Sequence, residues 1–209
     1  MFEIAARSVG VSLAATLVAA FFALGGALWI VYGRSPWRAL LSVLFTIGLG
    51  LPPVAVGLAV AFAFWRSGPL GSLDLLYTPT AMIVAQTVVI TPLMGTLAVL
   101  ALRAVDVSLN DQLTALGVPL ATRLWLLARE TLPGLLAAAL GGFGRAIAEV
   151  GAAQMTGGNI EGQTRVLTTA TMLDVGKGEF GAAFAHVVVL LGIVGVAGGC
   201  ALVLQSRWR

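Results

Sequence analysis

Charged side chains are scarce in this sequence. They make up 10% of its 209 residues, whereas a soluble domain has about a quarter. Hydrophobic residues make up 59%, and the mean hydropathy is +1.00. Five apolar runs take up more than half of the chain, and each is long enough to cross a hydrocarbon core of about 30 Å. The composition excludes a water-soluble globule and leaves no room for a separate soluble catalytic domain. The runs are residues 9–32, 41–65, 79–102, 132–155 and 182–204.

Cysteine and histidine occur once each, as Cys200 and His186. A single cysteine excludes an intramolecular disulfide, and a buried, inert thiol is the favoured interpretation. His186 is better explained as a packing residue than as a proton relay. The Gly-Lys-Gly tripeptide at 176–178 lacks the spacing of a phosphate-binding loop. We therefore expect no catalytic residues, no metal site and no cofactor bound by this chain.

The apolar runs predict an all-α fold, a membrane bundle of five transmembrane helices forming one domain over residues 1–209. Continuous apolar character without period-2 alternation favours helices over barrel strands. Pro52 and Pro53 in the second run, and Pro92 in the third, should kink those helices. Small residues recur every four positions in the first run, which favours close helix packing. They are Ala15, Ala19, Ala23 and Ala27.

The distribution of Lys and Arg predicts the topology of the chain. The net charge of +3 comes from basic residues scattered at the ends of the runs, which argues against nucleic acid as a partner. Seven basic residues fall on one side and four on the other, which places the N-terminus outside the cell and the C-terminus in the cytoplasm. We therefore expect a multi-pass protein of the cytoplasmic (inner) membrane. The seven are Arg34, Arg38, Arg103, Arg123, Arg129, Arg207 and Arg209; the four are Arg7, Arg66, Arg165 and Lys177.

Two connections between the runs are long. The cytoplasmic one, residues 103–131, contains an amphipathic pattern from Ser108 onward that predicts a short helix, which Gly117 and Pro119 end. Such a helix on the cytoplasmic side is suited to docking a partner. The external connection, residues 156–181, is glycine-rich at first and then predicts a short helix over residues 164–175.

Arg145 and Glu149 are the informative charged pair. They are four residues apart in the fourth run, on one face of a helix near the middle of the membrane. Charges there should face the interior of the bundle. Two interpretations are equally favoured, a structural ion pair and a part of a solute path. Gln154, Thr156 and Asn159 follow and could extend a hydrated route outward.

The stretch from 142 to 170, GFGRAIAEVGAAQMTGGNIEGQTRVLTTA, resembles the oxyanion permeases of ABC importers. Within that group it is most similar to the tungstate type, and molybdate permeases share a weaker version. Gln86-Thr87 and Thr91-Pro92 in the third run also suit the tungstate type. The resemblance implies the permease architecture of type I ABC importers, with a translocation pathway that includes Arg145, Glu149, Gln154, Thr156, Asn159 and Thr91.

The family's cytoplasmic signature, Glu-Ala-Ala-x-x-x-Gly with a later Leu-Pro, falls on residues 111–117 and 132–133. Asp replaces Glu, Gln-Leu replaces Ala-Ala, and the spacing from Gly117 to Pro133 is three residues longer than the general pattern. The resemblance thus implies a loop that couples the chain to an ATPase. Its candidate residues are Asp111, Leu113, Leu116, Gly117 and Arg123.

The resemblance implies a non-enzymatic transport subunit for tungstate. Its partners would be two ATP-binding cassette subunits, an external solute-binding protein, a second copy of the chain and the lipid bilayer. Molybdate or another oxyanion is the first alternative cargo. A self-contained channel or secondary transporter is the alternative class, but the five runs show no self-similar halves. A structural or signalling protein would leave Arg145, Glu149 and the cytoplasmic loop without a role.

Overall fold

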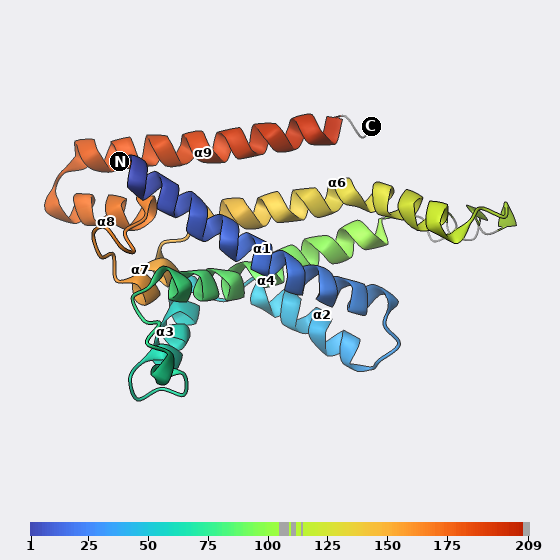
Figure 1. Ribbon diagram of the computed structural model, residues 1–209, viewed down its shortest axis with the longest axis horizontal. Coiled ribbons are helices and arrows are strands. Elements are labelled where there is room, and N and C mark those ends of the chain that lie inside the picture. Colours follow the sequence, from blue (N-terminus) through green and yellow to red (C-terminus); the bar gives the residue numbers. More distant parts are fainter. Residues whose placement is uncertain (105–108, 110–111, 114, 207–209) are drawn as a thin grey trace.

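The chain folds into a bundle of apolar helices (Figure 1). The computed structural model describes residues 1–104, 109, 112–113 and 115–206. Four helices in this part are long and apolar enough to cross a membrane: α1 (Phe2–Tyr32), α4 (Pro79–Arg103), α6 (Leu120–Ile147) and α9 (Phe180–Ser206). The predicted all-α membrane bundle is confirmed.

The second apolar run does not form one straight helix. It is divided into α2 (Trp37–Gly48) and α3 (Pro53–Phe64), whose axes differ by 112°. Pro52 has an extended backbone and precedes Pro53, which opens α3. Because two successive prolines lack N–H donors, the hydrogen-bond ladder cannot continue through them. The predicted kink is therefore a sharp bend that divides the run into two helices. The described helices give the five predicted spans only when α2 and α3 are counted together as one span.

The centre of the bundle is the packing of α1 against α4. The predicted row of alanines on α1 is buried along its length, because small side chains let the two helices approach closely. The hydroxyl of Thr87 on α4 reaches the backbone carbonyl of Ala15 at 3.4 Å. The main core cluster comprises Ala15, Ala19, Ala23, Val56, Ala85, Val89, Ile90, Met94, Ala146 and Ala152.

The fourth apolar run also differs from the prediction. Helix α6 begins at Leu120, twelve residues before the predicted span, and ends at Ile147; a separate short helix, α7 (Gly151–Gly157), follows. The predicted cytoplasmic loop therefore overlaps the first turns of α6. Helix α7 packs on α3 so closely that a Cβ on Gly57 would lie 2.7 Å from Cα of Ala152.

The predicted external connection contains α8 (Leu167–Lys177), close to its expected position. Helix α9 then runs beside α8 and α6 along one side of the bundle (Figure 1). Only 11% of its most apolar window is buried inside the chain, and the value for α6 is 12%. Both helices therefore present large apolar surfaces to surroundings other than this chain.

Candidate translocation and coupling sites

Arg145 and Glu149 form an ion pair where α6 ends. Nη1 of Arg145 donates to Oε2 of Glu149 at 2.6 Å. Arg145 lies in the last turn of α6, where the negative end of the helix dipole favours a cation. Glu149 lies beyond the end of α6 and not within a continuous span, which corrects its predicted position on the same helix.

The carboxylate of Glu149 is buried and has a second function. Its side chain is 4% exposed, whereas that of Arg145 is 40% exposed. Oε1 accepts from the backbone N–H of Ala152 at 3.2 Å, so the carboxylate caps the first turn of α7. The Thr168 hydroxyl, from α8, donates to the backbone carbonyl of Glu149 at 3.0 Å. Glu149 therefore links α6, α7 and α8.

The neutral residues predicted for the path are placed differently from one another. The Thr156 side chain is fully buried, and its hydroxyl donates to the carbonyl of Ala152 within α7. Thr91 on α4 similarly donates to the carbonyl of Thr87. Gln154 and Asn159, in contrast, line an open pocket of about 360 Å³. The hydroxyls of Thr91 and Thr156 are thus engaged within their own helices, while Gln154 and Asn159 border accessible space.

Lys177, Met172 and Leu173 of α8 also line this pocket, and Lys177 gives it a positive charge. Lys177 is not among the residues predicted for the path, because it lies 18 residues beyond Asn159 in the sequence and only the fold of the external connection brings the two together. Oδ1 of Asn159 is buried without a hydrogen-bond partner in the described part of the chain. Oε1 of Gln86 on α4 is in the same state, and Gln86 is 2% exposed.

The external connection is fastened to the start of α1. Nη1 and Nη2 of Arg7 donate to the backbone carbonyls of Arg165 and Gly162 at 3.0 and 2.7 Å. The Ser8 hydroxyl accepts from the backbone N–H of Leu167 at 2.8 Å, which satisfies a free donor at the start of α8. These bonds span more than 150 residues of sequence, so local patterns could not predict them.

His186, which the sequence favours as a packing residue, has an acidic neighbour in the structure. Its Nδ1 lies 3.0 Å from Oδ2 of Asp174, and both residues are buried where α8 packs on α9. The contact is within ion-pair distance, although the ring nitrogen has no aligned hydrogen-bond acceptor in the described structure. A packing role for His186 is consistent with this position.

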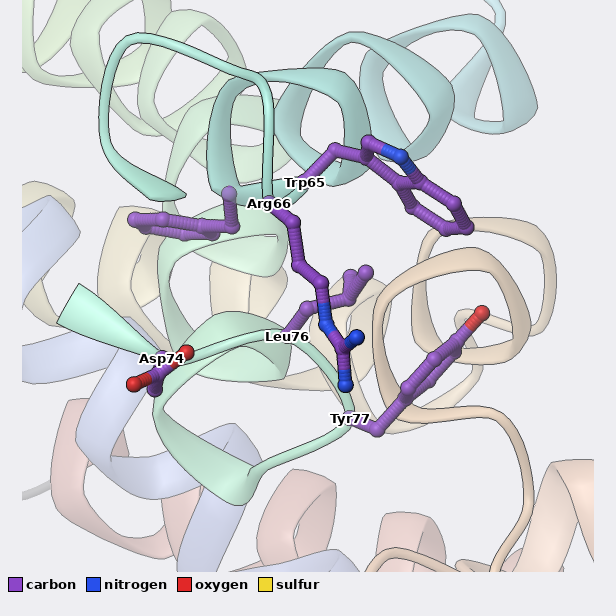
Figure 2. A pocket seen from close by; sticks show the side chains of 6 residues that line it. Trp65, Arg66, Asp74, Leu76 and Tyr77 are labelled. Atoms are coloured by element: carbon purple, nitrogen blue, oxygen red, sulfur yellow. The ribbon is translucent and has the colours of Figure 1, made fainter. Parts of the chain in front are cut away.

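A pocket of about 470 Å³ lies in the connection between α3 and α4 (Figure 2). The Arg66 side chain extends across it between Asp74 and the ring of Tyr77. The backbone N–H of Tyr77 donates to the carbonyl of Thr156 at 2.9 Å, which attaches this connection to the end of α7. Asp74 and Tyr77 both have left-handed backbone conformations, with φ of 48° and 63°. The pocket is thus held next to the helix that carries Gln154.

The predicted coupling segment is described in part. Leu113 is helical, and the helix ends where the N–H groups of Leu116 and Val118 donate to the carbonyls of Gln112 and Leu113, both at 3.0 Å. Gly117 has φ of +70°, the left-handed conformation that commonly terminates helices. The predicted helix end at Gly117 is confirmed.

The other residues predicted for the coupling loop differ in their exposure and contacts. Leu116 is 78% exposed, so its apolar side chain is free to contact a partner. Arg123 lies in the first turns of α6 and is engaged in an interaction. Asp111 lies outside the described residues.

Comparison with known proteins places the chain among transporter subunits, although no protein-family model matches it. It is 35% identical over 197 residues to a probable anion ABC transporter permease of Haloferax volcanii, covering 92% of this chain and 85% of that protein. It is 38% identical to the tungstate uptake permease TupB of Peptoclostridium acidaminophilum, covering 88% and 81%. It is 30% identical to the molybdenum transport permease ModB of Escherichia coli, covering 96% and 90%.

Solved structures show the same fold. A crystal structure of an amino acid ABC transporter matches 99% of this chain and 92% of its own, with a TM-score of 0.75 and 13% identity. The inward-facing MetNI methionine ABC transporter matches 100% and 98%, with a TM-score of 0.72 and 18% identity. The bent α2–α3 pair and the interrupted α6–α7 segment therefore belong to an importer permease fold. The chain belongs to the family of anion, tungstate and molybdate ABC transporter permeases, which are multi-pass proteins of the inner membrane.

Proposed function

We propose that this chain is the membrane-spanning subunit of a tungstate importer. The observation that supports tungstate is the 38% identity to a tungstate permease, compared with 30% to the molybdenum permease of Escherichia coli. Molybdate is the second candidate, because the two tetrahedral oxyanions have the same charge and the cargo is selected chiefly by the external binding protein. A self-contained channel or secondary transporter, the alternative class, does not fit a chain that belongs to a family of ABC permeases.

Partner subunits supply energy and cargo in this proposal. Membership of the family implies ATPase subunits on the inner side and a solute-binding protein on the outer side. We propose two ATPase subunits and a second copy of this chain. The large apolar surfaces of α6 and α9 support a second copy, because only 12% and 11% of the most apolar stretches of these two helices are buried within one chain.

The path proposed for the anion follows the open side of α6. Small residues surround Arg145 at the end of this helix: a Cβ on Gly144 would meet no atom within 4 Å, and Gly141 on the helix and Ala148 just after it are exposed. The partly exposed guanidinium of Arg145 is thus accessible from this side, while Glu149 is buried behind it. A doubly charged anion needs a path with little free negative charge, and burial of the carboxylate meets that requirement.

The outer part of the proposed path is the pocket that contains Gln154, Asn159 and Lys177. Helix α7, seven residues long, connects this pocket to the Arg145–Glu149 pair, since Glu149 caps its first turn and Gln154 follows in the same helix. Thr91 and Thr156 would then support the path without contacting the anion, because their hydroxyls are bonded within their helices.

The turn at Gly117 is the proposed docking element for the ATPase. Its support is the well-defined helix end and the exposed Leu116 beside it. In the predicted topology this turn lies on the cytoplasmic side, and Asp111, Leu113 and Arg123 would complete the contact.

Competition between the two anions tests the proposed cargo. Cells that express the chain with its cognate ATPase and binding protein are given nanomolar tungstate, and metal uptake is measured by mass spectrometry. We expect an equal concentration of molybdate to leave tungstate uptake nearly unchanged. If molybdate is accumulated and tungstate is not, the cargo is molybdate.

A further inference from the structure

A second cationic pocket lies at the opposite end of the bundle from α8. It has a volume of about 520 Å³ and is lined by the last turn of α1, by α2 along most of its length and by Arg103 at the end of α4. Figure 1 shows the ends of α1 and α4 on the side of the bundle away from α8. Arg38 and Arg103 line it together with apolar side chains that include Ile30, Val43 and Ile47. The predicted topology places this end of the bundle on the cytoplasmic side.

The positive charge of this pocket is not neutralised within the described part of the chain. Nη1 of Arg38 donates to the backbone carbonyl of Gly33 at 3.0 Å, and neither Arg38 nor Arg103 is paired with a described carboxylate. Two guanidinium groups that line one pocket repel each other unless an anion is bound between them. The pocket therefore has the charge of an anion site.

The apolar surface beside the pocket narrows the class of anion. Val43 and Ile47 of α2 line the pocket and are 50% and 62% exposed, so its apolar wall continues onto the outer surface of the helix. Tyr32 and Trp37, also exposed, are next in sequence to the lining residues Val31 and Arg38, and aromatic side chains of this kind favour the membrane interface. A small free anion would gain nothing from this apolar wall, whereas a lipid has both a charged headgroup and acyl chains.

We propose that this pocket binds an anionic phospholipid of the inner leaflet. The phosphate lies between Arg38 and Arg103, the Ser42 hydroxyl can donate to it, and an acyl chain follows Val43 and Ile47 along α2. Basic pockets between membrane helices on the cytoplasmic side are typical sites for such headgroups. The lipid would join the start of α2 to the end of α4. Since the predicted coupling loop, residues 103–131, begins at Arg103, the lipid would hold this first residue of the loop near the membrane surface.

Lipid titration of the purified full-length chain tests this proposal. Binding of dioleoyl-phosphatidylglycerol and dioleoyl-phosphatidylcholine is measured by native mass spectrometry from detergent micelles, with the thermal midpoint as a second readout. We expect the anionic lipid to bind and to raise the midpoint, and the zwitterionic lipid to do neither. Arg38→Gln and Arg103→Gln should each weaken binding of the anionic lipid about fivefold, and the pair about 25-fold. Arg34→Gln is the matched control: Arg34 is exposed and outside the pocket, so this variant should bind like the wild type.

Three results would overturn the lipid site: equal binding of both lipids, unchanged binding by the double Gln variant, or displacement of the lipid by millimolar inorganic phosphate or molybdate. The last result would indicate a site for a free anion. If the double Gln variant does not fold, Arg38→Lys with Arg103→Lys keeps both charges and should retain binding. In that case the test rests on the wild-type protein, which should bind the anionic lipid and not the zwitterionic one; equal binding of both would overturn the proposal.

Discussion

At the scale of single residues, the two partners of the ion pair are not equivalent. Glu149 is buried and holds α7 and α8 in place, whereas Arg145 is partly open to its surroundings. Loss of Arg145 leaves a buried carboxylate with one N–H donor. Loss of Glu149 leaves an arginine that can turn outward. The two single substitutions should therefore have unequal effects on stability.

We expect Arg145→Ala to lower the free energy of unfolding by about 2 to 3 kcal/mol, below the usual loss for a fully buried pair, because the Arg145 side chain is 40% exposed. Glu149→Ala should cost about 1 kcal/mol, the usual value of a lost helix cap. Thermal unfolding of the purified variants in detergent gives the order. A larger loss for Glu149→Ala would contradict this description of the pair.

A double substitution separates a structural pair from a path residue. Arg145→Met with Glu149→Leu removes both charges and keeps apolar volume, so the variant should assemble with its ATPase. We expect it to lose oxyanion uptake, because the anion would lose the guanidinium on the open side of α6. Assembly is checked by copurification and transport by uptake of tungstate. Uptake near the wild-type level would remove Arg145 from the path.

At the scale of elements, the turn at Gly117 is the proposed link to the ATPase. Gly117→Trp should leave the chain in the membrane but abolish copurification with the ATPase or uncouple transport from ATP hydrolysis. Gly117→Asn tolerates a positive φ and keeps the turn, so it should retain function. Gly181→Trp places the same bulk in open space at the far end and is the second control. Normal assembly and transport by Gly117→Trp would show that the turn does not dock the ATPase.

The elements also show which features a sequence can predict. Hydropathy identified the apolar helices, and Gly117 correctly predicted a helix end. The 112° bend after Gly48 was predicted only as a kink, because the angle depends on packing: a Cβ on Gly48 would overlap the ring of Pro92 on α4. The end of α6 at Ile147 was missed, because it falls inside a continuous apolar run, and the bond that Thr168 of α8 donates to the carbonyl of Glu149 comes from a distant part of the sequence.

The candidate site was predicted in part for the same reason. The spacing of Arg145 and Glu149 was sufficient to predict their ion pair, because it is local. Lys177 and Thr168 reach the site only through the fold of the external connection. No periodicity in the sequence relates these residues to α7.

At the scale of the whole molecule, the orientation in the membrane rests on the distribution of basic residues. In a Cys200→Ser background, Gln163→Cys on the external connection should react with an impermeant thiol reagent added to intact cells. Thr122→Cys, exposed at the start of α6, should react only after the cells are opened. Labelling of Thr122→Cys in sealed cells would reverse the predicted topology.

The central claim is that this chain forms the path of an ATP-driven oxyanion importer, and reconstitution tests it most directly. The chain, its cognate ATPase and the tungstate-loaded binding protein are assembled in proteoliposomes, and accumulated tungsten is measured with ATP on the ATPase side. We predict accumulation that needs ATP and the binding protein and that fails when the ATPase is inactivated by mutation. Equal accumulation without ATP would contradict the account and indicate a channel or a secondary transporter.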